Sequence, residues 1–267
     1  MKPSVRAALD RVATFLVPFL IYLVMSGAGF LLASHISDAL WATILVDLLV
    51  AAMCLWYMKK ASLTAPLKPR PLSQGLWIAL IVIFLSVRVF GTTTSSYLIS
   101  ITKDPASLHY IEDMQTPNVF LSLLCTVLVA PISEELFLRG VTYRSWSQVF
   151  GRPAAFIMQA CAFTLIHGTL MHLYYTFALA LLLALAYEMS DSILVPIGIH
   201  ALFNLAAILM GSMPLPTVFF NPYVFGVIDL ATVSVTCIMF GKWISCHKQI
   251  GCSGKAVLAL PAPKDDR

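Results

Sequence analysis

The chain is dominated by apolar runs that are long enough to cross a membrane. A membrane-spanning helix needs about 20 consecutive, mostly apolar residues. Only 11% of the 267 residues are charged, against about 25% in a soluble domain. The sequence therefore predicts an all-α, polytopic integral membrane protein with about eight transmembrane helices, at residues 12–34, 39–58, 75–98, 118–138, 153–170, 171–189, 192–211 and 223–245.

Positive charges between the apolar runs predict the orientation, because lysine and arginine collect in cytoplasmic loops. With eight spans, one side receives Lys2, Arg6, Arg11, Lys59, Lys60, Lys68, Arg70, Arg139, Arg144, Arg152, Lys242, Lys248, Lys255, Lys264 and Arg267. Only Lys103 falls on the other side, and Arg88 lies within a span. We therefore predict that both termini are cytoplasmic. These charges form no basic stripe with interleaved aromatic residues, so no nucleic-acid partner is expected.

Two adjacent glutamates, Glu134 and Glu135, stand near the end of the fourth predicted span. A charge at the centre of a spanning helix costs about 2.5–3.5 kcal/mol, so such residues are candidates for function, although a helix end that meets water also tolerates them. Glu135 and Arg139 are four residues apart with the acid first, which favours an ion pair on one helical face. Glu134 points about 100° away from that pair. We therefore predict that Glu134 has no built-in counter-charge and exchanges protons near neutral pH.

Two further pairs of polar or aromatic residues lie inside predicted helices. Phe163 and His167 are four residues apart, and so are His200 and Asn204. A single histidine in a span is more often a packing residue than a catalyst. Two strongly polar side chains on one face of an apolar helix need a polar cavity or a partner helix, because unpaired polar groups in lipid are costly.

Other polar residues in the predicted spans are less informative. Asp47, Arg88 and Asp229 have no ionisable companion at helical spacing, and Asp47 or Asp229 could pair with Arg88. Pro131 and Pro196 precede the polar residues of their segments. Each removes a helix hydrogen bond, and we expect kinks there that free the carbonyls four residues earlier, although prolines are also common in spanning helices.

Three segments together resemble the signature of a known family. EELFLR (134–139), FTLIH (163–167) and HALFN (200–204) occur in this order within about 70 residues. They resemble the Glu-Glu-x-x-x-Arg, Phe-x-x-x-His and His-x-x-x-Asn motifs of the CAAX prenyl protease and bacteriocin-processing (Abi, CPBP) family of intramembrane endopeptidases. Each motif alone is a weak signal, but all three in order in a polytopic protein are a strong one. The resemblance covers roughly residues 118–210.

The resemblance implies an intramembrane endopeptidase that hydrolyses a peptide bond of a membrane-associated peptide or protein. Glu134 would be the general base that activates water, with His167 as its partner. His200 and Asn204 would steady the oxyanion. The implied catalytic set is Glu134, His167, His200 and Asn204, and the implied supporting set is Glu135, Arg139 and Phe163.

The resemblance leaves the metal requirement open. Glu134, His167 and His200 could supply three ligands to a divalent metal such as zinc and keep one position open. The sequence has no HExxH motif, which is the usual helical signature of a zinc protease. The expected cofactor is therefore either none or a divalent metal.

On this interpretation the chain has three parts. Residues 1–117 form N-terminal transmembrane helices and an outer loop, residues 118–245 form the catalytic transmembrane core, and residues 246–267 form a cytoplasmic tail. We expect a prokaryotic plasma membrane protein whose active site faces the cytoplasm. Its partners would be the lipid bilayer and a peptide or protein substrate.

Two other functions stay open. A catalytically inactive scaffold or regulator of the same family would bind a partner protein with the same motifs. A small transporter would also place acids and histidines inside helices, but it would predict related halves, which the sequence does not show.

Overall fold

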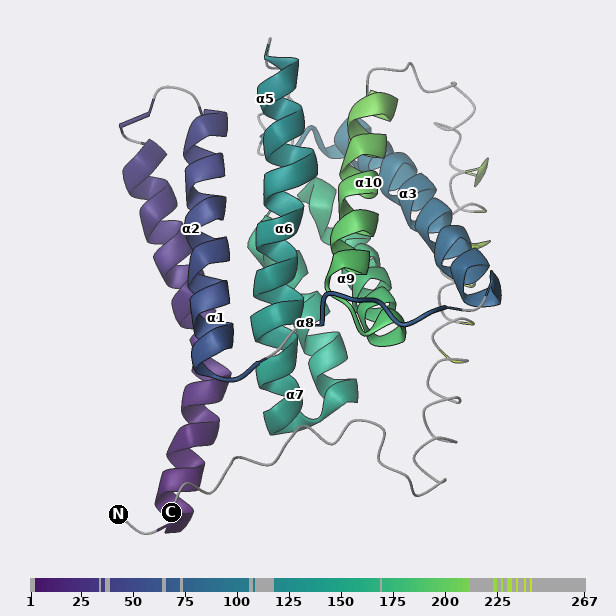
Figure 1. Ribbon diagram of the computed structural model, residues 1–267. Helices are drawn as coiled ribbons and strands as arrows, with labels where there is room; N and C mark the ends of the chain where they lie inside the picture. The colour runs from purple at the N-terminus through teal and green to yellow at the C-terminus, as the bar shows by residue number, and fades with distance from the viewer. Residues whose placement is uncertain are drawn as a thin grey trace.

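A computed structural model describes the chain as a bundle of helices (Figure 1). The described residues are 3–33, 35–36, 39–63, 66–72, 74–105, 108, 118–168 and 170–211, with positions 223, 224, 227, 230, 231, 234, 238 and 241. Within them the helices are α1 (Pro3–Ala33), α2 (Ala39–Lys60), α3 (Gln74–Thr102), α5 (Val119–Leu123), η1 (Leu124–Val129), α6 (Ala130–Glu135), η2 (Leu136–Tyr143), α7 (Arg144–Phe150), α8 (Arg152–His167), α9 (Leu170–Ser190) and α10 (Leu194–Gly211). Most of the predicted outer loop and eighth span, and the whole tail, lie outside the described residues.

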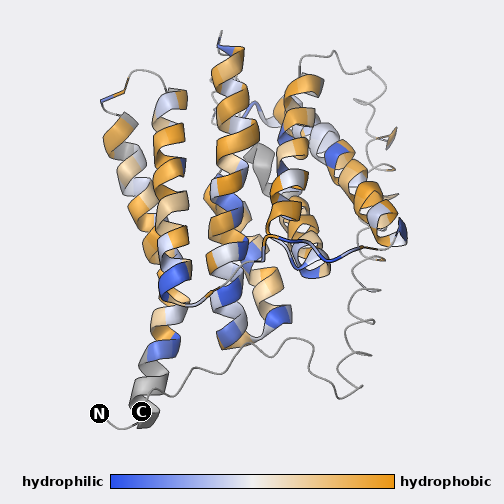
Figure 2. Ribbon diagram, viewed as in Figure 1, coloured by the Kyte–Doolittle hydropathy of each residue, from blue (hydrophilic) through white to orange (hydrophobic). Residues whose placement is uncertain are grey.

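The chain is an integral membrane protein by the length and polarity of its helices. In the described part, four helical stretches are long and apolar enough to cross a membrane, namely Asp10–Gly29, Leu40–Lys60, Gln74–Thr102 and Val119–Phe150. Tyr175–Ser190 and Leu194–Leu209 are shorter apolar helices. Apolar colour covers most of the bundle in Figure 2, and hydrophilic residues gather toward its lower end. The all-helical membrane fold is confirmed, whereas the count of eight spans stays a prediction.

Residues Val119–Phe150, hereafter the long helix, form one continuous element made of α5, η1, α6, η2 and α7. Asn118 caps its start by accepting a hydrogen bond from the backbone N–H of Leu121 at 3.0 Å. Gly151 ends it with φ 81°, a conformation that favours glycine. The helix therefore continues 12 residues beyond the span predicted at residues 118–138. Hydropathy falls after residue 138, but the polar side chains that follow are buried by neighbouring helices and the helix continues.

Helix α8 is shorter than a typical membrane-spanning helix. Its 16 residues rise about 24 Å, whereas the hydrocarbon core is about 30 Å thick. The helix ends at His167, and Gly168 follows in the left-handed conformation with φ 63°. The break between the fifth and sixth predicted spans thus lies a few residues earlier than expected. His167 is therefore the last residue of its helix.

Ion pairs join several segments at the lower end of the bundle. Arg70, before α3, lies 2.7 Å from Asp191, after α9. Arg152, at the start of α8, lies 3.6 Å from Glu188 of α9, and Tyr143 of the long helix donates to Glu188 at 2.8 Å. These contacts agree with the expectation that the arginines between the spans share one side of the membrane. The absolute orientation stays a prediction.

The apolar core draws on helices from both sides of the division predicted at residue 117. Val50 of α2 and Val87 of α3 belong to the same buried cluster as Leu138 of the long helix and Phe203 of α10. Helix α2 packs against η1, α6 and η2, and α3 packs against α9 and α10. The first three helices thus help to enclose the segment that carries the three motifs.

Candidate active site

The two glutamates occupy a short α-helical turn between two π-helical stretches. Glu134 and Glu135 end α6, which η1 precedes and η2 follows. A π-helix is wider than an α-helix, is rare, and often occurs at functional sites. Helices α2 and α10 pack directly against α6. The turn that carries the two glutamates is therefore enclosed by neighbouring helices.

The predicted ion pair between Glu135 and Arg139 is present and fully buried. Arg139 Nη1 donates to Glu135 Oε1 at 2.7 Å, and both side chains are 0% exposed. Arg139 Nη2 donates to the carbonyl of Ala180 in α9 at 2.7 Å, and its guanidinium lies 5.9 Å from the ring centre of Phe163 in α8. One cation thus ties the long helix to α9 and contacts α8.

His200 lies between the two glutamates. Its Nδ1 is 3.0 Å from Glu135 Oε1, and its Nε2 is 3.8 Å from Glu134 Oε2. A carboxylate that already accepts from Arg139 has no proton to give, so His200 Nδ1 is the donor to Glu135. This bond fixes the ring and turns Nε2 toward Glu134.

Glu134 differs from Glu135 in the way predicted from their helical faces. The side chain of Glu134 is 24% exposed, and that of Glu135 is 0% exposed. Glu134 Oε2 is itself buried and accepts no hydrogen bond within the described chain. Glu134 therefore has a partly accessible carboxyl group whose inner oxygen faces the Nε2 atom of His200.

His167 and Phe163 sit beside this arrangement. His167 Nδ1 lies 2.8 Å from the carbonyl of Phe163, and the two ring centres are 4.4 Å apart. The Phe163 ring is also 5.9 Å from the ring of His200. Among the described residues, His200 is the histidine within ion-pair distance of Glu134. The partnership of His167 with Glu134 stays a prediction.

Asn204 donates a hydrogen bond to a backbone carbonyl that Pro131 leaves without a helical donor. In η1 the N–H of Ala130 donates five residues back to the carbonyl of Cys125. The next bond in this register would run from Pro131 to Thr126, but proline has no N–H. Asn204 Nδ2 donates to the Thr126 carbonyl instead, at 2.9 Å. Asn204 therefore anchors α10 to the long helix, a role that the motif resemblance did not imply.

The predicted effects of the two prolines need correction. The freed carbonyl near Pro131 is that of Thr126 and not that of Val127, because the local register is π-helical rather than α-helical. Pro196 lies in the first turn of α10, which begins at Leu194. A missing N–H costs nothing there, so the predicted interruption of a helix before His200 is wrong.

Asp47 is a nearby acid that sequence spacing could not place. It lies on α2, is buried, and interacts electrostatically with Glu134. Its possible pairing with Arg88 is not found among the described residues, where Arg88 donates to Thr92 at 2.7 Å and lies 4.7 Å from the ring centre of Phe203. Asp229, the other candidate partner of Arg88, lies outside the described residues. The only sequence signal for Asp47 was a charge inside an apolar run.

The predicted metal-ligand set does not assemble. Among the described residues, no three His, Cys, Asp or Glu side chains form a group that could hold a metal ion. Glu135 and the Phe163 carbonyl hold the Nδ1 atoms of His200 and His167, which leaves the Nε2 atoms as the ones that a metal could bind. Glu134, His167 and His200 do not fit a three-ligand zinc site in this arrangement because they do not come together as one group.

Fold and site together define a helical membrane protein with a buried Glu-Glu-Arg-His cluster. Residues 116–206 match the family described as Rce1-like, type II CAAX prenyl endopeptidase. The matched range contains all three motifs and nearly coincides with the predicted 118–210, which confirms the resemblance to this peptidase family over that part of the chain. Comparisons with curated proteins and with solved structures gave no match.

We predict that removing either partner of the buried ion pair destabilises the fold strongly. Glu135→Gln leaves Arg139 buried without its counter-charge. Arg139→Gln in turn leaves the buried Glu135 without its cation. Each change should cost about 3–5 kcal/mol, and the double change should cost less than the sum of the two. Thermal unfolding in detergent measures this. The control Arg70→Gln removes the exposed partner of a partly exposed pair and should cost at most about 1 kcal/mol. A double variant as unstable as the sum would contradict the coupling.

We also predict that Asn204→Ala lowers stability by about 1–3 kcal/mol, because the Thr126 carbonyl loses its donor. Pro131→Ala restores a backbone N–H at the position that can serve this carbonyl. In a Pro131→Ala background, Asn204→Ala should therefore cost clearly less. Unfolding midpoints of the four proteins measure the difference. An equal loss in both backgrounds would show that Asn204 does not act through the Thr126 carbonyl.

Proposed function

We propose that the chain is an intramembrane endopeptidase that hydrolyses a peptide bond of a membrane-associated peptide or protein with a water activated at Glu134. The observation that carries the proposal is the position of Glu134 Oε2, which is buried, accepts no hydrogen bond from the described residues, and lies 3.8 Å from His200 Nε2. Peptide hydrolysis needs a positioned base and a donor for the developing oxyanion. Glu134 and His200 supply one of each.

The charges of the cluster favour this division of roles. Arg139 and Glu135 neutralise one another in a place without solvent. Counting Glu134, Glu135, Arg139 and His200 alone, a neutral cluster then requires one proton to be shared between Glu134 and His200, since an uncompensated buried charge is costly. In one of the two neutral states Glu134 is a carboxylate and His200 is protonated on both ring nitrogens. That state combines a base with an adjacent cationic donor.

The reaction begins with a water that binds beside Glu134. Glu134 takes one proton from it as its oxygen attacks the scissile carbonyl carbon, and the carbonyl oxygen becomes negatively charged. The Nε2–H of His200 stabilises that oxygen. The intermediate collapses when the C–N bond breaks, and Glu134 gives its proton to the departing amine. No covalent enzyme intermediate forms, and no step passes through a metal.

The other motif residues support this pair. Glu135 and Arg139 hold His200 in place by accepting its Nδ1–H and by anchoring the carboxylate that accepts it. Asn204 uses one amide hydrogen on Thr126, which leaves its second hydrogen for the oxyanion. His167 is proposed as a further partner of the water or of the leaving amine. Phe163 packs between the two histidines.

The proposed setting is a prokaryotic plasma membrane, with residues 118–245 as the catalytic core and its site facing the cytoplasm. Arginine and lysine between the spans support this orientation. The proposed substrate is held at the membrane, because the site lies within an apolar bundle whose outer surface exposes residues such as Leu23 and Leu202.

We predict that Glu134→Gln lowers cleavage at least about 100-fold while the protein stays folded. The change removes the base but keeps the size of the side chain, and general acid–base catalysis contributes about 10²–10⁴. The midpoint of thermal unfolding should stay at the wild-type value, since Glu134 makes no direct ion pair with Arg139. The measurement compares membrane peptides between cells that carry the wild-type protein and cells that carry the variant.

A matched control is Asp10→Asn, which removes an exposed carboxylate outside the motifs and should leave cleavage intact. Deletion of the whole chain separates the enzyme from the inactive scaffold. If the protein is an enzyme, deletion and Glu134→Gln change the same peptides. If Glu134→Gln preserves every cleavage that deletion abolishes, Glu134 is not the base.

A further inference from the structure

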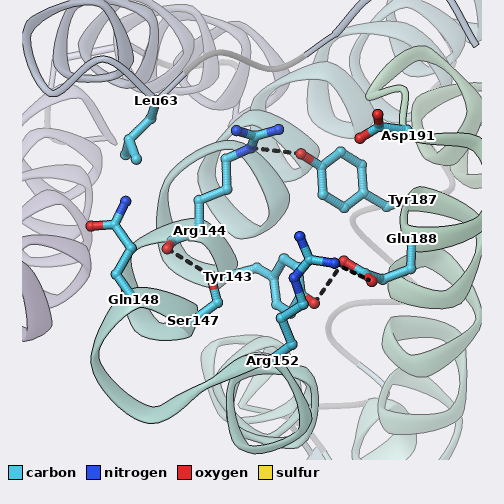
Figure 3. Close-up of a pocket in the computed structure, with 9 residues that line it drawn as sticks. All are labelled: Leu63, Tyr143, Arg144, Ser147, Gln148, Arg152, Tyr187, Glu188 and Asp191. Carbon is cyan, nitrogen blue, oxygen red and sulfur yellow. Dashed lines mark hydrogen bonds and ion pairs between the residues drawn. The ribbon is translucent and has the colours of Figure 1, made fainter. Parts of the chain in front are cut away.

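A polar cavity lies at the lower end of the bundle, away from the glutamates. Its volume is about 150 Å³, and no motif residue lines it. It lies between α7, the start of α8, the end of α9 and the segment after α2 (Figure 3). Pockets for whole small molecules usually measure about 300–1,000 Å³. This cavity therefore suits a single chemical group better than a peptide segment.

The acidic residues that line the cavity are already neutralised. Glu188 lies 3.6 Å from Arg152 and accepts a hydrogen bond from Tyr143 at 2.8 Å. Asp191 pairs with Arg70 at 2.7 Å. With these pairs complete, Arg144 is the lining cation that has no carboxylate partner among the described residues. The cavity therefore carries one uncompensated positive charge.

Arg144 is held in place with most of its donors unused. Its Nε donates to the hydroxyl of Tyr187 at 2.6 Å, and its guanidinium lies 5.6 Å from the Tyr187 ring centre. Tyr187 is buried, so it fixes the arginine. A guanidinium has five N–H donors, and the four on Nη1 and Nη2 have no partner within the described chain. Figure 3 shows the guanidinium between Leu63 and Asp191.

Two neutral donors complete the lining. The Tyr187 hydroxyl accepts from Arg144, so its own hydrogen is free to donate. Gln148 is exposed and also lines the cavity, and its side-chain amide is a further N–H donor. A planar guanidinium fork with nearby O–H and N–H donors matches a group that has several anionic oxygens, and arginine is the usual residue for binding phosphate in two-point contact.

We propose that this cavity binds a phosphate group, presented by the head group of an acidic membrane phospholipid. Leu63 gives the cavity an apolar edge, and the basic end of the bundle is where hydrophilic residues replace the apolar surface (Figure 2). Basic pockets between transmembrane helices at this level bind acidic lipid head groups. The proposal is independent of peptide hydrolysis at Glu134.

The test is lipid-dependent thermal stability of the purified full chain in detergent. Short-chain phosphatidylglycerol should raise the unfolding temperature saturably, and short-chain phosphatidylcholine should do so only at clearly higher concentration. Arg144→Gln should weaken the phosphatidylglycerol effect about tenfold or more. Tyr187→Phe, which keeps the aromatic ring but removes the hydroxyl, should weaken it severalfold. The control Lys60→Gln removes an exposed cation from the same end of the bundle and should leave the phosphatidylglycerol effect unchanged.

A parallel titration with inorganic phosphate identifies the source of the group. Stabilisation by phosphatidylglycerol alone supports the lipid head group, and stabilisation by inorganic phosphate at equal concentration supports the same site with free phosphate as its occupant. The proposal is overturned if Arg144→Gln responds as the wild type does, or if Lys60→Gln loses as much as Arg144→Gln. If Arg144→Gln does not fold, an unchanged response of Tyr187→Phe overturns it.

Discussion

The buried ion pair between Glu135 and Arg139 is the interaction on which the rest of the site depends. Both side chains are removed from solvent within an apolar bundle, where a lone charge would be very costly. Their attraction alone does not offset that cost. Arg139 also donates to Ala180 of α9, and Glu135 also accepts from His200 of α10. The pair is stable because three helices contribute to it, and it fixes how these helices meet.

The consequence is that two neighbouring glutamates have different environments. Glu135 is enclosed and held by two donors, so it serves as a fixed negative charge. Glu134 keeps partial exposure and faces the free nitrogen of a histidine that Glu135 orients. Pairs of carboxyl groups in unlike surroundings are a common way to separate a structural acid from a reacting one. This asymmetry underlies the peptidase function proposed above.

Local spacing explains which features were predictable from the sequence. The Glu135–Arg139 pair follows from a separation of four residues on one helix, and the same argument set Glu134 apart. The helical membrane fold follows from the apolar runs. The three motifs also located the range that matches the Rce1-like family. All of these depend on residues that are close in sequence or on residue types alone.

The features that were missed depend on tertiary structure. Asn204 binds Thr126 because a π-helical register moves the carbonyl that Pro131 leaves free, and spacing alone assumes an α-helix. Asp47 approaches Glu134 from α2, far away in sequence. The long helix continues past residue 138 because neighbouring helices cover its polar side chains, which hydropathy does not detect. The placement of His200 between both glutamates likewise required the packing of α10 on α6.

The central claim is that Glu134 and His200 work as one unit, and a double-mutant cycle on peptide cleavage tests it most directly. The wild-type protein, Glu134→Gln, His200→Gln and the double variant are compared per folded molecule. When two residues act as one catalytic unit, removing the second after the first causes little further loss of rate. The predicted result is that the double variant is no slower than the slower single variant. Losses that multiply across the two changes would show that the residues act independently and would contradict the claim.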